Sequence, residues 1–270
     1  MRSITLFILI TLLITSCTRN NVNNKAEYKP LFEKYGVRGC WGMLDNSYNQ
    51  FSVYNLKRFR DSAYSPASTF KIVNSLIGIE TGKLDEKALA KWDGVDRGRP
   101  EWNQDQDFTT AFKNSTVWYF QALARRIGKD TMQRYLDTLS YGSKKIIGAV
   151  DSFWLNNSLT IKPDEQMGLV KKLYFTQFGK LFSNRTMSKV KDAMLVEKTD
   201  KYALSYKSGL GTTKAGIPMG WVIGWVEYGI NESRKINFFV LNIEGSKTDN
   251  EMIELRKKLL FDLLKAEKVI

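Results

Sequence analysis

The hydrophobic pattern predicts strands towards both ends of the chain. Residues 37–44 form an almost continuous apolar run, and with residues 50–56 they are expected to make a hairpin closed over residues 45–47. Three later segments are rich in β-branched and aromatic residues and are separated by turn-forming stretches: residues 201–208, 221–228 and 235–244. This arrangement is typical of an antiparallel sheet.

The middle of the chain follows a helical pattern instead. Apolar residues recur at helical spacing in seven segments, namely 26–35, 66–81, 108–127, 129–139, 163–178, 183–197 and 250–268. Ser65 is a candidate N-cap of the second segment, and Pro66 suits its first position. The polar stretch 83–106 is expected to be an irregular surface connection.

These elements predict an α+β fold. An antiparallel sheet would be covered by the N- and C-terminal helices, with a helical subdomain inserted. Residues 25–60 and 198–270 would form the sheet part, and residues 61–197 the mainly helical part. We expect a cleft at their seam, with the segment 202–209 as an edge strand beside it.

The composition excludes several kinds of site. The 270 residues are 43% hydrophobic, which is enough for a sizeable core, and they include no histidine. A Ser-His-Asp triad, a Cys-His dyad and histidine-built zinc sites are therefore ruled out. The net charge is +13, but basic residues are scattered among acidic ones, as in 249–268, and do not interleave with aromatic residues. We expect a basic surface and no nucleic-acid partner.

Residues 1–17 have the pattern of a targeting segment. A short basic start precedes an apolar run at 4–14, and small residues lead to Cys17. The segment resembles a bacterial lipoprotein signal, which implies export to the periplasm and a membrane attachment only through a lipid on Cys17; an ordinary cleaved leader is the alternative. Residues 18–24 would be a flexible tether, and Cys40 a buried core residue.

The segment 64–74 offers a possible nucleophile. Ser68 and Lys71 lie three residues apart, so a helix would place both on one face, near its positive end. The pair alone is ambiguous, because a serine at a helix start and a lysine along its surface are both common. Ser188 and Lys191 have the same spacing in a polar stretch and are interpreted as a solvated face.

Two further segments carry hydroxyl groups and a cation. Ser115 precedes an apolar helical segment, where it could simply be an N-cap, and Lys207-Ser208-Gly209 ends a strand where glycine allows close approach. With Ser68 and Lys71, they follow the order of the signature motifs of serine β-lactamases and penicillin-binding proteins. The details resemble class D, the oxacillinase group, in segments 66–71, 114–121, 141–142, 151–155, 207–209 and 220–226.

The resemblance implies a β-lactam substrate and a role for each matched residue. Ser68 would be the nucleophile, and Lys71 would be N-carboxylated by carbon dioxide or bicarbonate, so that its carbamate acts as the general base. No metal or organic cofactor is implied. Trp154 would donate its indole N–H to the carbamate, and apolar neighbours would keep the Lys71 amine neutral: Phe70, Val117, Trp154 and Leu155.

The remaining matched positions are implied to bind substrate or move a proton. Ser115 and Lys207 would relay a proton to the leaving nitrogen, and the backbone N–H groups of Ser68 and Leu210 would form the oxyanion hole. Substrate contacts are implied for Val117, Ser208, Gly209, Leu210 and Arg256, with Arg256 pairing with the substrate carboxylate.

Some positions depart from the family pattern, and some alternatives stay open. Ser143 stands where the family usually has asparagine, and Ser208 where threonine is commoner. Arg256 belongs to a run of three cations that could be a solvated helix face. A transpeptidase or β-lactam sensor would acylate at Ser68 without turnover, and a non-enzymatic envelope lipoprotein would not acylate. No pattern in the sequence specifies an oligomeric state.

Overall fold

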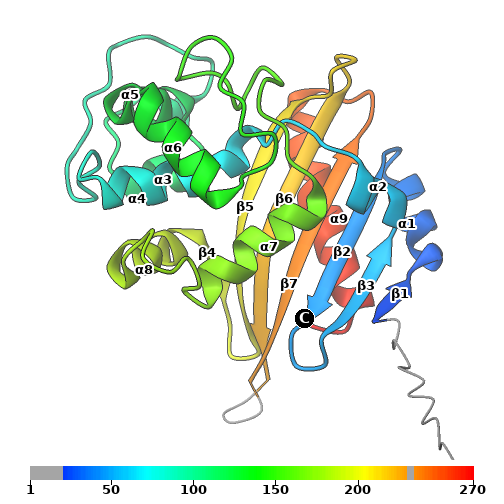
Figure 1. Cartoon of the computed structure of the whole chain (residues 1–270). Helices are drawn as coiled ribbons and strands as arrows, with labels where there is room; N and C mark the ends of the chain where they lie inside the picture. Colours follow the sequence, from blue (N-terminus) through cyan, green and yellow to red (C-terminus); the bar gives the residue numbers. More distant parts are fainter. Residues whose placement is uncertain (1–20, 230–233) are drawn as a thin grey trace, which may run out of the picture.

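The computed structural model describes residues 21–229 and 234–270. The expected signal, residues 1–17 with Cys17, lies outside the described residues. In the described part, seven strands form one sheet in the order β1-β3-β2-β7-β6-β5-β4 (Figure 1). The strands are β1 (Val22–Asn24), β2 (Arg38–Asp45), β3 (Gln50–Tyr54), β4 (Leu195–Lys198), β5 (Tyr202–Thr212), β6 (Pro218–Tyr228) and β7 (Lys235–Glu244).

Helices cover both faces of this sheet. They are α1 (Lys29–Lys34), α2 (Leu56–Asp61), α3 (Lys71–Glu80), α4 (Phe108–Lys113), α5 (Val117–Ile127), α6 (Lys129–Leu139), α7 (Pro163–Tyr174), α8 (Asn184–Met194) and α9 (Asp249–Ala266). Helices α1 and α9 pack on one face, and α7 crosses the other, beside the group formed by α3 to α6 (Figure 1). The predicted fold class is therefore confirmed. Within the described residues, no helix is both long and apolar enough to cross a membrane.

Alternation along the central strands separates two hydrophobic cores. In β6, Trp221 and Ile223 belong to the core on the α3 side, whereas Val222 and Val226 belong to the core under α9. Successive strand residues point to opposite faces, so a strand buried on both faces is a nearly continuous apolar run. Cys40 in β2 is a buried free thiol, as expected.

One expected helix, 163–178, ends early at Tyr174, and two more depart from their apolar pattern because of tertiary contacts. The segment 108–127 is broken into α4 and α5 at residues 114–116, where Ser115 has φ +57°. The segment 183–197 stops at Met194, because the chain then pairs with β5 as the short strand β4. In both of these segments, tertiary contacts override the helical preference that the apolar spacing indicates.

The sheet extends further at both edges than the sequence indicated. Val22–Asn24 belong to the segment expected to be a flexible tether, yet they form β1, which pairs in parallel with β3. At the other edge β4 pairs with Ala203–Ser205, so β5 is not an edge strand there. Beyond Ser205, these described strands leave the outer edge of β5 open. The predicted edge is thus correct only from Tyr206 onward.

A buried ion pair ties α2 to β7, and its loss should destabilise the protein. The Arg58 guanidinium donates to Asn242 Oδ1 at 2.7 and 3.0 Å and lies 3.1 Å from Glu244 Oε1. We expect Arg58→Met to lower the free energy of unfolding by about 3 kcal/mol, because a buried carboxylate loses a partner. Urea titration measures this loss. Lys29→Ala, at the exposed pair with Glu33, should cost less than about 0.5 kcal/mol; equal losses would contradict the argument.

Candidate active site

Ser68 lies in a tight turn just before α3. Residues Ala67–Phe70 form a 3-10 turn that continues into α3 at Lys71. Lys71 Nζ donates to Ser68 Oγ at 2.7 Å, so the two candidate residues are in direct contact. Ala67 has φ +48°, a conformation that is uncommon for a residue other than glycine. Such strain persists only where the surrounding structure holds it.

The backbone carbonyl of Trp154 holds this turn in place. It accepts hydrogen bonds from Ser65 Oγ at 2.7 Å and from the Ala67 N–H at 3.1 Å. The Trp221 indole N–H donates to the Ser65 carbonyl at 2.9 Å. Ser65 was predicted to be an N-cap, and this is wrong: the turn has Pro66 at its N-cap position, without a side-chain cap. Ser65 instead joins the nucleophile turn to the loop that carries Trp154.

A second buried contact reaches the turn from α7. Gln166 Nε2 donates to Thr69 Oγ1 at 2.8 Å, and Thr69 Oγ1 donates to the Pro66 carbonyl at 2.7 Å. Gln166 was not singled out in the sequence, and Ser65 was singled out only as a helix cap. Gln166 did leave a signal, because it is a polar residue on the buried face of an amphipathic helix, beside Met167 and Val170. A polar residue at such a position needs a hydrogen-bond partner.

Burial decides the chemical state of Lys71. Its side chain is almost completely buried, with Nζ 5.3 Å from the centre of the Phe120 ring. Burial lowers the pKa of the Lys71 amine to about 7, because a low-dielectric environment disfavours the ammonium form. At neutral pH a substantial fraction of the amine is therefore uncharged and able to act as a base or nucleophile.

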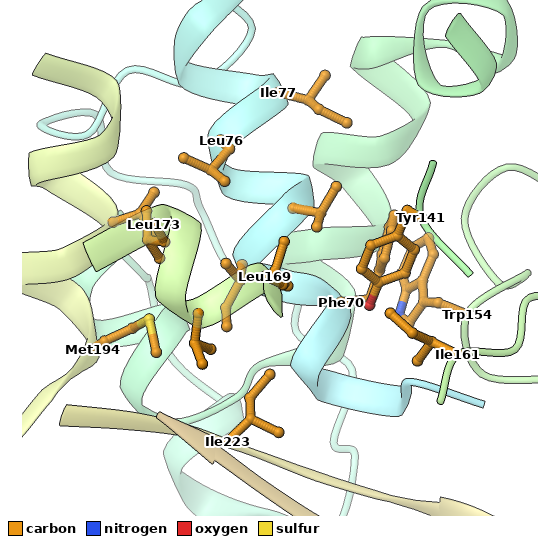
Figure 2. Packing of buried hydrophobic residues seen from close by; sticks show 14 of the residues in the cluster. Phe70, Leu76, Ile77, Tyr141, Trp154, Ile161, Leu169, Leu173, Met194 and Ile223 are labelled. Carbon is orange, nitrogen blue, oxygen red and sulfur yellow. The ribbon is translucent and has the colours of Figure 1, made fainter. Parts of the chain in front are cut away.

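Trp154 has a buried donor without an acceptor. Its indole is packed against Phe70, with ring centroids 5.3 Å apart, and against Phe153 at 5.1 Å (Figure 2). Among the described residues, no hydrogen-bond acceptor lies within reach of the Trp154 Nε1 atom. A buried unpaired N–H costs free energy, so an acceptor placed beside the Trp154 indole would be stabilised there.

Ser115 and Lys207 are in direct contact. Ser115 lies in the break between α4 and α5, and Lys207 Nζ donates to its Oγ at 2.8 Å and to the Ser208 carbonyl at 3.1 Å. Burial, followed by the charges of Lys71 and Arg256, lowers the pKa of Lys207 well below its usual value. Val117 is the half-buried first residue of α5. The two motifs, 92 residues apart, form one hydroxyl–amine pair.

Glycine lets β5 approach the nucleophile turn closely. A Cβ atom at Gly209 would lie 3.1 Å from the Pro66 carbonyl oxygen, and one at Gly211 would lie 3.3 Å from Ala67 Cβ. Both glycines flank Leu210, so the backbone of Leu210 lies over the turn that carries Ser68. The backbone N–H groups of Ser68 and Leu210 are thus candidates to stabilise an oxyanion beside Ser68 Oγ.

Arg256 contacts β5, whereas the two lysines that follow it in the chain face solvent. From α9, Arg256 Nη1 donates to the Gly209 carbonyl at 2.6 Å. Burial lowers the pKa of Arg256 to about 10. Lys257 and Lys258 are exposed, and Lys258 pairs with Glu254 at 3.3 Å. Of the three cations in this run, Arg256 is therefore the one beside β5.

Ser143 is hydrogen-bonded to the loop that contains Thr160. Its N–H donates to the Thr160 carbonyl at 2.8 Å, and its Oγ accepts from the Thr160 N–H at 3.1 Å. The serine hydroxyl thus meets a backbone donor at the position where the family usually has an amide. Within the described residues, no group of three or more His, Cys, Asp or Glu side chains could hold a metal ion.

Comparisons with known proteins identify the family and the fold. A family model described as penicillin binding protein transpeptidase domain matches residues 19–265. β-Lactamase OXA-48 from Klebsiella pneumoniae is 37% identical over 88% of this chain and 87% of its own. Regulatory protein BlaR1 from Bacillus licheniformis is 34% identical over 82% of this chain, which spans only 36% of that relative. The solved class D β-lactamase from Sebaldella termitidis ATCC 33386 matches with TM-score 0.85 and 29% identity, over 92% of this chain and 98% of its own.

Proposed function

The chain belongs to the class D serine β-lactamases, within the penicillin-binding transpeptidase family, and we propose that it hydrolyses β-lactams through an acyl-enzyme on Ser68 with carboxylated Lys71 as the base. The observation that carries the proposal is the buried contact of Lys71 Nζ with Ser68 Oγ at 2.7 Å. It is supported by the Trp154 indole, which stacks on Phe70, the residue before Lys71, and whose N–H has no acceptor among the described residues. A carbamate would need both features.

In the acylation step, Ser68 Oγ attacks the lactam carbonyl carbon and its proton passes to the carboxylated Lys71 side chain. The oxyanion is stabilised by the backbone N–H groups of Ser68 and Leu210. The carbon–nitrogen bond of the lactam then breaks. The leaving nitrogen takes a proton from Ser115, which Lys207 replaces across their 2.8 Å contact.

Carboxylation of Lys71 would also prepare Lys207 for this role. The cationic form of Lys71 is one of the charges that lower the pKa of Lys207. A carbamate replaces that repelling cation with an anion, which favours the ammonium form of Lys207. Lys207 could then act as the acid that supplies the proton.

The residues fit the addition of carbon dioxide to Lys71. A pKa of about 7 makes the neutral, nucleophilic amine available, and the Trp154 N–H offers the carbamate a donor. The added group supplies a strong base within a dry site. After acylation, Lys71 would give up the proton it took from Ser68, and Lys207 would regain the one it lost. In deacylation, Lys71 would then take a proton from the water molecule that attacks the Ser68 ester and pass it to Ser68 Oγ as the ester breaks. Ser208 and Arg256 would hold the substrate carboxylate throughout.

A receptor or transpeptidase role is the second candidate, because a regulatory protein is among the relatives. Such a protein would form the Ser68 adduct and keep it. Labelling with a fluorescent penicillin, followed by a chase with unlabelled penicillin, separates the candidates. A hydrolase loses the label within minutes and turns over nitrocefin. A lasting label without nitrocefin turnover would replace the hydrolase by the receptor, and no label would exclude both.

Activity should depend on pH through the amine of Lys71. Below a pKa of about 7, the neutral fraction of the amine falls about tenfold per pH unit. At fixed dissolved carbon dioxide, nitrocefin hydrolysis should therefore fall between pH 7 and pH 5.5, and raising carbon dioxide should restore it. Rates measured at several carbon dioxide concentrations test this. Hydrolysis that ignores carbon dioxide at pH 5.5 would rule out the carbamate.

A further inference from the structure

A groove of about 280 Å³ lies beside Lys207 and Ser208, along the open edge of β5. Lys207 and Ser208 line one side of it, Phe112 at the end of α4 another, and Leu195 and Val196 at the start of β4 a third. It exists because β4 pairs with β5 no further than Ser205. A larger hollow of about 490 Å³ between α1 and α9 shares no residue with the site.

The groove has an apolar wall that is open to solvent. Leu195 and Val196 are 38% and 50% exposed, although both are large aliphatic side chains. Exposed apolar side chains that line a groove rimmed by polar residues can mark a ligand-binding groove. Lys113 is also exposed at the rim, and the lining includes no acidic side chain.

The position of the groove relative to the reacting atoms identifies what would enter it. In the proposed function, on which this inference rests, Lys207 faces the leaving nitrogen and Ser208 the substrate carboxylate. In a cephalosporin, the carbon that bears the carboxylate is bonded to that nitrogen, and the next ring carbon, C3, carries a variable substituent. That substituent must therefore leave the ring beside Lys207 and Ser208, where the groove begins.

We propose that this groove is a subsite for an uncharged, apolar C3 substituent of cephalosporins, with Leu195 and Val196 as specificity-determining residues. Its volume supports this use, because sites for whole ligands are usually about 300 Å³ or larger. A groove of this size suits a fragment. Penicillins carry only two methyl groups at the corresponding part of their second ring and would leave the groove largely empty.

Paired substrates test the subsite. Two cephalosporins are compared that share one 7-acylamino group and carry either methyl or an arylthiomethyl group at C3, together with benzylpenicillin. The variant Leu195→Ala/Val196→Ala should lower kcat/KM for the arylthiomethyl compound about tenfold relative to the methyl compound, since it removes apolar contacts. For benzylpenicillin, kcat/KM should change less than about twofold. If one of the cephalosporins is not hydrolysed, we measure its inhibition constant in nitrocefin hydrolysis and compare that value in place of kcat/KM.

A matched control uses Leu89→Ala/Val95→Ala. These residues are exposed to 54% and 52% but are not part of the groove lining, so the ratio between the two cephalosporins should stay as in the unmodified enzyme. An unchanged ratio in Leu195→Ala/Val196→Ala, with benzylpenicillin hydrolysis intact, overturns the subsite. Failure of the unmodified enzyme to hydrolyse any β-lactam would instead overturn the proposed function.

Discussion

Replacing Lys71 with alanine is expected to lower kcat for nitrocefin by about 1,000- to 10,000-fold, and bicarbonate should not restore it. Lys71 Nζ is 2.7 Å from Ser68 Oγ and is the proposed base in both acylation and deacylation. Removing it takes away the proposed base, and the chain has no histidine that could replace it. Steady-state hydrolysis with and without added bicarbonate measures the loss.

Ser68→Ala provides the comparison for this prediction. It should abolish nitrocefin turnover and also the adduct with fluorescent penicillin, because the nucleophile is gone. Lys71→Ala keeps the nucleophile and should still form the adduct slowly, then retain it. Turnover that is lost in Ser68→Ala but intact in Lys71→Ala would show that another group is the base. Circular dichroism establishes that both variants are folded.

Replacing Trp154 with phenylalanine is expected to slow deacylation about 100- to 1,000-fold, more than it slows acylation. The indole N–H is buried without a partner among the described residues, and a carbamate on Lys71 would accept it. Without that donor the carbamate is less stable, and more carbon dioxide should be needed for full activity. A burst of nitrocefin hydrolysis followed by a stalled acyl-enzyme should appear in stopped-flow traces.

Trp41→Phe is the matched control for this effect. Trp41 is also fully buried and donates its indole N–H, to Glu267 at 3.1 Å, but it belongs to the core under α9. Both variants should lower the unfolding midpoint, since each loses volume in a packed core. Only Trp154→Phe should change the burst and the carbon dioxide requirement. Equal kinetics in the two variants would mean that the Trp154 indole has no special role.

The sequence alone predicted the general arrangement of the fold and which reactive side chains the site contains. Period-two and continuous apolar segments predicted β2, β3, β5, β6 and β7 but not the edge strands β1 and β4, and the helical subdomain followed from helical spacing. The periodicity could not reveal the break at Ser115 or the end of α8 at Met194. Ser115 in the break contacts Lys207, 92 residues away, and α8 ends where the chain pairs as β4 with the next strand, β5; helical spacing records neither contact.

Some of the expected site residues contact one another through hydrogen bonds, and others are positioned by packing. Ser68 with Lys71, and Ser115 with Lys207, meet through hydrogen bonds, while Arg256 reaches the Gly209 carbonyl. The order of their motifs indicated these residues. Ser65 and Gln166 were missed as supports of the nucleophile turn, because a single serine or glutamine has no recognisable spacing. Their partners lie 89 and 97 residues away.

By itself, the sequence determined which reactive groups the protein has and which it lacks: a serine and lysines in a recognisable order, and no histidine. Only the tertiary structure decided the state of those groups. The pKa of Lys71 near 7 and the unpaired Trp154 N–H both arise from burial by residues distant in the chain. The open edge of β5 and its groove arise from where β4 stops pairing. Desolvation and close approach are properties of three-dimensional packing, and hydrophobic spacing along a chain does not encode their extent.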